Sequence, residues 1–275
     1  MTRLRSAIAS LAAPARGRRP VWLAVVLSLV IGGTALAQRG GYRYAPFAEP
    51  TNPRYDGQFM FARLKYSVGP GGYYYRGLPA WAHGEPFAEE NLMKIMDSVS
   101  LLAPHIDEGV VMSLDDPDLM KFPVSYMTEA GFWTMSDEEG KALAEYLKKG
   151  GFVIFDDFRD PPRGGGGYDN FLYNIQRAMP GIQPLPMDIS HPIFHAFYEI
   201  ESFDLVPQAY DNFVRPSFLG LFEDNDPKKR LMAIVNYNTD IADFWEFSGR
   251  GWYPVDSSNE AYKLGVNYII YGLTH

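Results

Sequence analysis

The chain has 275 residues, with 33 acidic and 25 basic side chains, a net charge of −8 and no cysteine. An acidic protein repels polyanions, so nucleic acid and anionic membrane surfaces are excluded as expected partners. Without cysteine the protein forms no disulfide, carries no lipid-modified cysteine and has no thiol nucleophile.

The first 37 residues have the pattern of a secretory signal peptide. Residues 1–20 contain five arginines and no acidic residue, residues 21–31 are apolar, and Ala35 and Ala37 form an A-x-A cleavage site. The apolar run is shorter than the roughly 20 residues that a membrane-spanning helix needs. We therefore expect cleavage after Ala37 and a periplasmic or secreted protein of 238 residues, with 20 basic and 33 acidic side chains and a net charge of −13. The alternative is an uncleaved signal peptide (1–37) that anchors the protein in the inner membrane.

A leader, a strand and a helix are predicted next. Residues 38–57 are rich in Gly, Pro and Tyr without periodicity, which predicts an extended leader that reaches from the membrane or wraps the domain. Residues 59–66 alternate as a strand does. Residues 69–77 form a loop whose three tyrosines either pack or make a recognition patch. Residues 87–102 place apolar side chains at helical spacing, with acidic residues in the first turn, and predict a helix.

The rest of the chain alternates strands with helices. Ser136 and Glu139 have the spacing of a capping box, and the helix that they begin ends at Gly150 and Gly151. The further predicted strands are 109–114, 124–127, 152–155 and 231–235, and the further helices are 170–179 and 259–273. This alternation indicates βαβ units. We therefore predict a single α/β domain over residues 58–275, with a mostly parallel, flavodoxin-like sheet flanked by helices.

Two aspartates, Asp156 and Asp157, follow the apolar run 152–155. Continuous apolar residues are typical of a strand that helices cover on both faces, and ligands of such sheets bind beyond the carboxyl ends of the strands. Successive residues of a strand point in opposite directions. We therefore expect one aspartate to face a pocket, and the other to cap backbone amides or pair with Arg159 or Arg163. The alternative is a solvated turn.

A second acidic segment follows the last predicted strand. Residues 236–247 contain Asp240, Asp243 and Glu246. With the two strand-end aspartates, these side chains would form an acidic pocket for a metal or a sugar. The alternative is a solvated polar loop anchored by Trp245.

Histidines occur in two short motifs. His191 and His195 lie four residues apart, a spacing that suits zinc on one helix face. The HExxH motif is absent, however, and Pro192 favours a cap or loop role for His191. His83 and Glu85 form a polar pair at a loop-to-helix junction, where a structural role is also favoured. The glycine-rich segments lack the residues of a phosphate-binding loop, and no G-x-S-x-G nucleophile motif occurs.

Seven segments carry a family resemblance through their order and spacing. They are RLKYS (63–67), WAHGEPFAEENLM (81–93), FPVSYMTEAG (122–131), SDEEGKALAEYLKKGGFVIFDD (136–157), MPGIQPLPMDISHPIFHAFY (179–198), NTDIADFWE (238–246) and NEAYKLGVNYIIYGLT (259–274). The chain resembles the bacterial domain-of-unknown-function family 4159 in these segments. The resemblance implies a fold similar to class I glutamine amidotransferases and to trehalose-utilisation-type domains. It implies no activity, but members often lie beside MoxR-type ATPases and von Willebrand-type proteins, which implies envelope proteins as partners.

Amidotransferases of that fold place a cysteine at a sharp strand-to-helix turn. In this chain Asp156 or Asp157 occupies the corresponding position, and no cysteine is present. A carboxylate does not replace a thiolate in acyl transfer from glutamine. Glutamine amidotransferase activity is therefore excluded.

Two functions remain open. The first is a non-catalytic, exported domain that binds an envelope partner or a ligand at the strand ends, without a cofactor. The second is a hydrolase, on carbohydrate for example, whose acidic residues act directly or hold a divalent metal. The catalytic candidates are Asp156, Asp157, His191 and Asp240. The ligand-binding candidates are Asp156, Asp157, Arg159, His191, Asp240, Trp245 and Glu246.

Overall fold

The computed structural model of the protein describes residues 47–74, 77–160, 167–207 and 214–275. The predicted signal peptide (1–37) and the first part of the leader lie outside the described residues. Pro46–His275 form one compact unit. Among the described helices, none combines the length and the hydropathy that crossing a membrane requires.

Five strands of the central sheet are parallel. In spatial order they are β3 (Val110–Ser113), β1 (Ala62–Lys65), β4 (Val124–Thr128), β6 (Phe152–Phe158) and β9 (Leu231–Tyr237). The sheet continues with two antiparallel strands, β8 (Ser217–Phe222) and β7 (Leu185–Pro186). The prediction of an α/β domain with a mostly parallel sheet is confirmed. The two antiparallel strands are not predicted from the sequence, because β7 has only two residues and β8 contains Gly220, which weakens the strand pattern.

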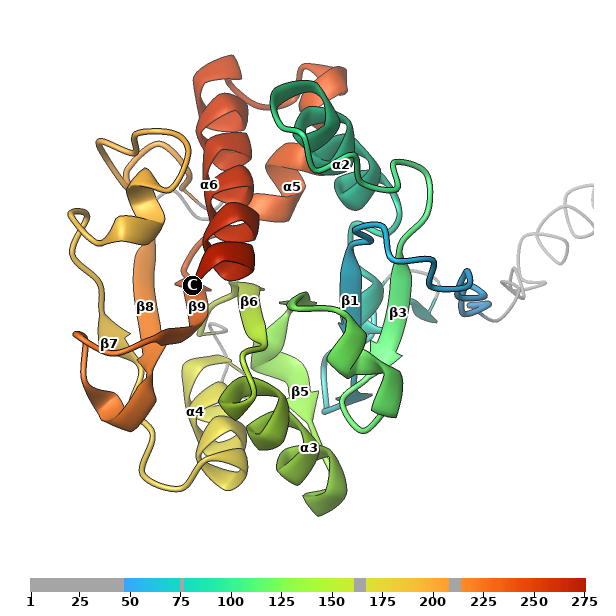
Figure 1. Cartoon of the computed structure of the whole chain (residues 1–275), viewed down its shortest axis with the longest axis vertical. Coiled ribbons are helices and arrows are strands. Elements are labelled where there is room, and N and C mark those ends of the chain that lie inside the picture. Colours follow the sequence, from blue (N-terminus) through green and yellow to red (C-terminus); the bar gives the residue numbers. More distant parts are fainter. Residues whose placement is uncertain (1–46, 75–76, 161–166, 208–213) are drawn as a thin grey trace, which may run out of the picture. The chain divides into compact units, whose positions relative to one another are not determined.

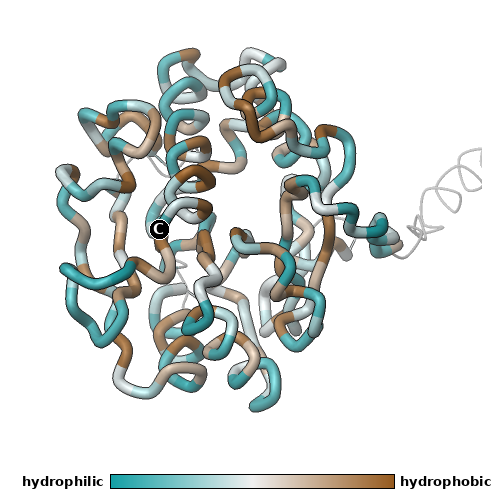
Figure 2. Tube along the Cα trace, viewed as in Figure 1, coloured by the Kyte–Doolittle hydropathy of each residue, from teal (hydrophilic) through white to brown (hydrophobic). Residues whose placement is uncertain are grey.

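Helices cover both faces of the sheet (Figure 1). The helices on one face are α2 (Phe87–Val99), α5 (Ile241–Glu246) and α6 (Val255–Thr274), and those on the other are α3 (Asp137–Lys148) and α4 (Gly167–Ala178). Neighbouring residues of β6 join different hydrophobic clusters: Val153 packs with α3 and α4, and Ile154 packs with the other three helices. Figure 2 shows hydrophobic residues recurring along the strands and helices, with hydrophilic residues in the peripheral loops.

Short elements connect the longer ones. Strand β2 (Ser67–Val68) pairs antiparallel with β5 (Trp133–Thr134) in a separate ribbon. The described 3-10 helices are η2 (Ala80–Ala82), η3 (Pro117–Lys121), η4 (Ala130–Phe132), η5 (Pro192–His195), η6 (Glu223–Asn225) and η7 (Ser248–Arg250). Of these, η2 lies between β2 and α2, and the next residue, His83, is near Glu129 at the end of β4.

Helix α3 has the termini that the sequence predicts. Ser136 Oγ accepts a hydrogen bond from the backbone N–H of Glu139 (3.1 Å), and the Ser136 N–H donates to Glu139 Oε2 (2.7 Å). These two bonds make the capping box. Gly150 has a φ of +109°, which glycine adopts without a Cβ clash. A Cβ on Gly151 would lie 2.4 Å from Tyr146 Cε1, so β6 begins directly against that ring.

Residues 47–57 wrap the edge of the sheet, one of the two arrangements predicted for the leader. Asn52 Nδ2 donates to the Val111 carbonyl (2.8 Å), and Asn52 Oδ1 accepts from the Val111 N–H (2.7 Å). The side-chain amide therefore satisfies backbone groups of the outer strand β3, which would otherwise be open to another chain. Phe47 adds an edge-to-face contact with Trp81, with ring centroids 5.4 Å apart.

Strand β6 is longer than predicted and contains both aspartates. Asp156 pairs in register with Thr128 of β4, but the pairing with β9 shifts between Phe155 and Phe158. Within that irregularity Asp157 has a φ of +54°, which is uncommon for a residue other than glycine. The ladder is therefore locally disrupted at the two aspartates, as in a β-bulge. Both are buried, with 0% exposure for Asp156 and 5% for Asp157, which excludes a solvated turn.

Candidate functional site

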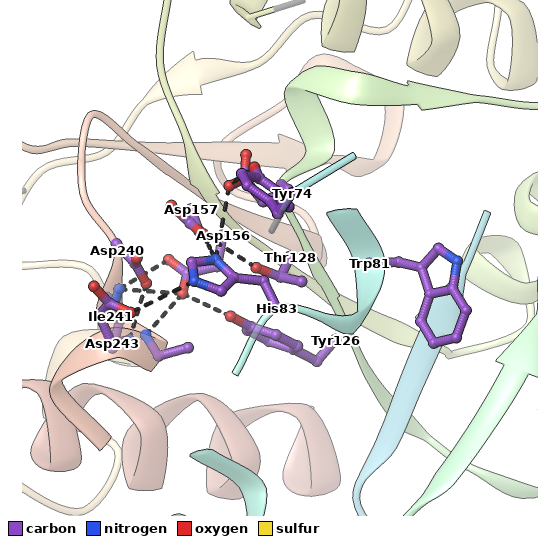
Figure 3. A network of polar contacts seen from close by, with 12 residues as sticks. Tyr74, Trp81, His83, Tyr126, Thr128, Asp156, Asp157, Asp240, Ile241 and Asp243 are labelled. Atoms are coloured by element: carbon purple, nitrogen blue, oxygen red, sulfur yellow. Dashed lines mark hydrogen bonds and ion pairs between the residues drawn. The ribbon is translucent and has the colours of Figure 1, made fainter. Parts of the chain in front are cut away.

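Polar side chains gather at the carboxyl ends of β4, β6 and β9, which are neighbours in the sheet. At each of these ends a non-glycine residue is left-handed: Glu129 (φ +52°), Asp157 (φ +54°) and Asn238 (φ +61°). Such conformations cost about 1–3 kcal/mol each and cluster at functional sites. Tyr74 and His83, from the connection between β1 and α2, complete the group (Figure 3).

Asp156 holds the first turn of α5 in place. Its carboxylate accepts hydrogen bonds from the Tyr126 hydroxyl (2.9 Å), the Asn236 side-chain amide (3.1 Å) and the backbone N–H groups of Ile241 and Ala242 (both 3.2 Å). Figure 3 shows this carboxylate turned toward α5. Burial and the adjacent aspartate raise the pKa of Asp156 to about 7, although donors such as Tyr126 lower it. Asp156 is therefore the inward aspartate that caps backbone amides.

Asp157 points to the other side and pairs with His83. Its Oδ2 lies 2.9 Å from His83 Nδ1 and accepts a bond from Thr128 Oγ1 over 3.5 Å. Burial lowers the pKa of His83, but the hydrogen bond to Asp157 and the charges of Asp157, Glu129 and Asp243 outweigh it and raise that pKa to about 9. At neutral pH His83 is therefore an imidazolium that donates Nδ1–H to Asp157. Its side chain is 28% exposed, which leaves it accessible.

Glu129 lies on the same side of the imidazole as Asp157. Its Oε1 is 3.7 Å from His83 Nδ1 and accepts a hydrogen bond from the Tyr74 hydroxyl. The Tyr74 ring stacks on the imidazole, with ring centroids 5.4 Å apart. Burial and the charge of Asp157 raise the pKa of Glu129 well above its usual value. The Tyr66 hydroxyl donates to the Glu129 carbonyl (2.8 Å) and so supports its left-handed backbone.

Helix α5 supplies acidic residues on the opposite side of His83. Asp240 caps the helix by accepting a bond from the Asp243 N–H (2.9 Å). Asp243 Oδ1 lies 3.9 Å from His83 Nε2, and its Oδ2 accepts a bond from the Tyr253 hydroxyl (2.9 Å). Glu246 Oε2 is buried and has no hydrogen-bond partner among the described residues. Burial, followed by nearby carboxylates, raises the pKa of all three of these carboxyl groups.

Two sets of side chains around His83 have the spacing of metal ligands. One set is His83, Glu129 and Asp157, and the other is His83, Asp243 and Glu246; within each set the ligand atoms lie within 4.8 Å of one another. His83 Nδ1 is already hydrogen-bonded to Asp157. Its Nε2 faces Asp243 instead. A histidine that binds a metal through one nitrogen usually donates its other N–H to a carboxylate, so the second set has the better geometry.

Four of the predicted site residues meet at these strand ends: Asp156, Asp157, Asp240 and Glu246. Trp245 lies in the hydrophobic core at 1% exposure and does not line the site. A solvated loop at 236–247 is also excluded, because the segment begins in β9 and half of it forms α5, which is largely buried.

Arg159 and His191 have other surroundings. The partner of Asp157 is His83 rather than Arg159, and Arg163 lies outside the described residues. His191 Nδ1 accepts a bond from the Ile193 N–H (3.2 Å) and caps η5, in agreement with the structural role that Pro192 favours. The His191 ring packs 5.7 Å from that of Phe222.

That contact places His191 at the far end of the sheet. Phe222 pairs with Leu231, the first residue of β9, so it lies at the amino ends of the parallel strands. Asp156 and Asp157 lie at the carboxyl ends. The structure therefore does not bring His191 together with the strand-end aspartates.

Glu129 and Tyr74 are not among the site residues predicted from the sequence, and His83 is predicted to have a structural role. The motif around His83 has no metal-ligand spacing of its own, because the main partner, Asp157, is 74 residues away. One usable signal was present. Glu129 lies two residues after the predicted strand 124–127, near its carboxyl end, and carboxyl ends of parallel strands share one edge of a sheet.

The family described as Domain of unknown function (DUF4159) matches residues 60–273. The chain belongs to this family. The DUF4159 match contains every strand of the sheet and all the residues around His83, whereas the leader at 47–57 precedes it. No curated protein matches the chain.

Proposed function

We propose that this DUF4159 protein is an exported ligand-binding domain whose strand-end site holds a divalent cation. The geometry around His83 carries the proposal. Its Nδ1 is hydrogen-bonded to Asp157, its Nε2 lies 3.9 Å from Asp243 Oδ1, and Glu246 completes a set whose ligand atoms lie within 4.8 Å of one another. Metal-binding histidines use this arrangement, because the carboxylate fixes the ring and raises its basicity. The cation would bind His83 Nε2, an oxygen of Asp243 and the unpartnered Oε2 of Glu246.

The charge of the site supports a bound cation. Glu129, Asp157, Asp243 and Glu246 surround the single imidazole of His83. Burial raises the pKa of Glu129, Asp243 and Glu246, and a neighbouring carboxylate raises it further: Asp157 for the first two and Asp243 for Glu246. A divalent cation stabilises those ionised forms, and on binding it replaces the proton on His83 Nε2 as well as the protons that the carboxyl groups would otherwise bind.

The ligand set favours a particular group of metals. Imidazole with carboxylates suits Zn²⁺ and Mn²⁺, whereas Ca²⁺ and Mg²⁺ prefer oxygen ligands. Three protein ligands leave positions open for an external ligand with carboxylate, phosphate or hydroxyl oxygens. In this proposal the domain works in the envelope, as its signal-peptide pattern predicts, with an envelope protein as a partner. Amidotransferase-like domains use the carboxyl ends of these strands for acyl transfer. In this proposal the same strand ends bind a ligand.

Metal titration of a single pair of variants tests the proposal. We would remove metals with EDTA, dialyse, and titrate Zn²⁺ or Mn²⁺ by calorimetry into the parent, Glu246→Gln and Glu199→Gln. Glu199 is the matched control because it pairs with His195 on the surface, another carboxylate–imidazole contact. We expect one cation per parent chain, binding weakened at least about 10-fold in Glu246→Gln, and unchanged binding in Glu199→Gln. Absence of binding, or equal affinities of the three proteins, would refute the proposal.

A hydrolase that uses the same metal is the second candidate. The left-handed backbone at both Glu129 and Asp157 favours it, because strain of this kind accompanies catalytic sites. A bound zinc would lower the pKa of a coordinated water to about 7 and supply a nucleophile. Turnover of generic ester, phosphoester or glycoside substrates by the metal-loaded parent, lost in Glu246→Gln, would support hydrolysis. Metal binding without turnover of these substrates would favour the binding function over hydrolysis.

A further inference from the structure

A cavity of about 490 Å³ lies away from the strand ends, beside the outer strand β3. Its walls come from three parts of the chain: residues 50–53 of the leader, the α2 helix, and the segment 106–111 that leads into β3. Apolar side chains such as Phe61, Met93 and Ile106 line much of it. This volume is within the range of about 300–1,000 Å³ that small-molecule sites occupy.

A buried ion pair, Arg63 with Glu89, lies at the cavity. Arg63 is 1% exposed and Glu89 is 8% exposed, and both line the cavity. Arg63 Nε and Nη2 both contact the same carboxylate oxygen, Glu89 Oε1. Arg63 Nη1 donates to the carbonyls of Trp81 and His83, both at 2.8 Å.

This arrangement leaves the second oxygen of the carboxylate without a donor. Glu89 Oε2 is buried and has no hydrogen-bond partner among the described residues, and neither has Arg63 Nη2, whose contact with Oε1 is an ion pair only. Burying a carboxylate oxygen without a donor is unfavourable, so such an atom in a cavity wall marks a place for a ligand donor. Glu89 lines the cavity, so a ligand donor there can reach Oε2 while Arg63 keeps its contacts with Oε1.

The charge of the cavity defines the kind of donor. Its lining contains one basic side chain, Arg63, and five acidic ones: Glu85, Glu89, Glu90, Asp107 and Glu108. Arg63 is paired with Glu89, and Glu90 pairs with Lys94, which does not line the cavity, so the negative charge of the cavity comes chiefly from Glu85, Asp107 and Glu108. A cationic group is attracted to this field, and an anionic one is repelled.

We propose that the cavity binds a small organic cation: an apolar body with a primary ammonium group. The ammonium group donates a hydrogen bond to Glu89 Oε2, and the body lies against Phe61, Met93 and Ile106. This site is separate from the cation site around His83, since none of the proposed metal ligands lines the cavity. Either proposal can fail without the other.

Three probes that differ in charge but little in shape test the proposal. They are 2-phenylethylammonium, 2-phenylethanol and phenylacetate, each titrated into the full domain in EDTA and followed by methyl NMR at Met93 and Ile106. We expect saturable shifts of both methyl signals with the ammonium compound, much weaker shifts with the alcohol and none with phenylacetate. Phenylacetate binding as tightly as the ammonium compound, or no saturable shift with any probe, overturns the proposal.

Two further proteins separate binding in the cavity from attraction to the acidic surface. Ile106→Trp fills the cavity at a half-buried position and should abolish the ammonium shifts at Met93. The double variant Asp107→Asn, Glu108→Gln removes exposed charges at the cavity rim and should weaken binding about 5-fold at low salt. Its control, Glu138→Gln with Glu145→Gln, removes two exposed charges from α3 on the opposite face of the sheet and should bind like the parent. Parent-like binding by Ile106→Trp, or equal weakening by the two double variants, overturns the assignment to this cavity.

Discussion

Replacing Asp156 with asparagine should destabilise the fold, whereas the same replacement at Asp157 should not. Asp156 accepts bonds from Tyr126 and Asn236 and from two backbone N–H groups of α5. An asparagine offers one oxygen and one NH₂ group, so in either orientation at least one buried donor faces another donor. A buried donor left without an acceptor costs about 1–3 kcal/mol.

We therefore expect Asp156→Asn to lower the free energy of unfolding by about 2 kcal/mol, a fall of roughly 4–8 °C in melting temperature for a domain of this size. Asp156→Ala removes both oxygens and should cost about 4 kcal/mol. Asp157→Asn keeps a side chain that tolerates a left-handed φ. It loses the pair with His83 but also relieves the repulsion that Asp157 exerts on Glu129, so its melting temperature should stay near that of the parent.

Thermal and urea melts of the metal-free proteins at pH 7.5, followed by circular dichroism, measure these differences. An unchanged urea m value would show that the variants unfold from equally compact states. Metal titration of Asp157→Asn adds a second measurement, since loss of the carboxylate that orients His83 should weaken cation binding about 10-fold. The reasoning fails if Asp156→Asn melts with the parent, or if Asp157→Asn loses as much stability as Asp156→Asn.

Three further predictions concern the helix end, pH and the N-terminus. Gly150→Ala should cost about 1 kcal/mol through its positive φ, and Gly151→Ala should cost more because Tyr146 must move; parent-like melts would contradict both. The pKa of His83 is raised from 6.5 to about 9, so its contribution to stability is fully present below pH 6.5 and is lost as pH rises through 9. The stability difference between the parent and His83→Gln in EDTA should therefore shrink between pH 6 and pH 9.5, and a constant difference would argue against the ion pair. Intact-mass analysis of protein from its native host should give a chain that begins at Gln38, and a chain that keeps the preceding residues would contradict cleavage.

Local sequence patterns determine much of the framework of this protein. The capping box at Ser136 and the glycines after α3 act through neighbouring residues, so their spacing alone predicts the helix. The continuous apolar run before Asp156 similarly predicts a strand covered on both faces. The position of Asp156 and Asp157 at the carboxyl end of that strand follows from the same pattern.

The composition of the site depends on contacts between distant segments, and only the tertiary structure decides it. Glu129 and His83 lie on separate connections, and they meet Asp157 because β1, β4 and β6 are adjacent in the sheet. His191, by contrast, is at the other end of the sheet, although its motif is the more suggestive of the two histidine motifs. The order of the strands in the sheet sets the distances between these side chains. Each strand has the same apolar pattern whichever strand it pairs with, so the local sequence does not predict that order.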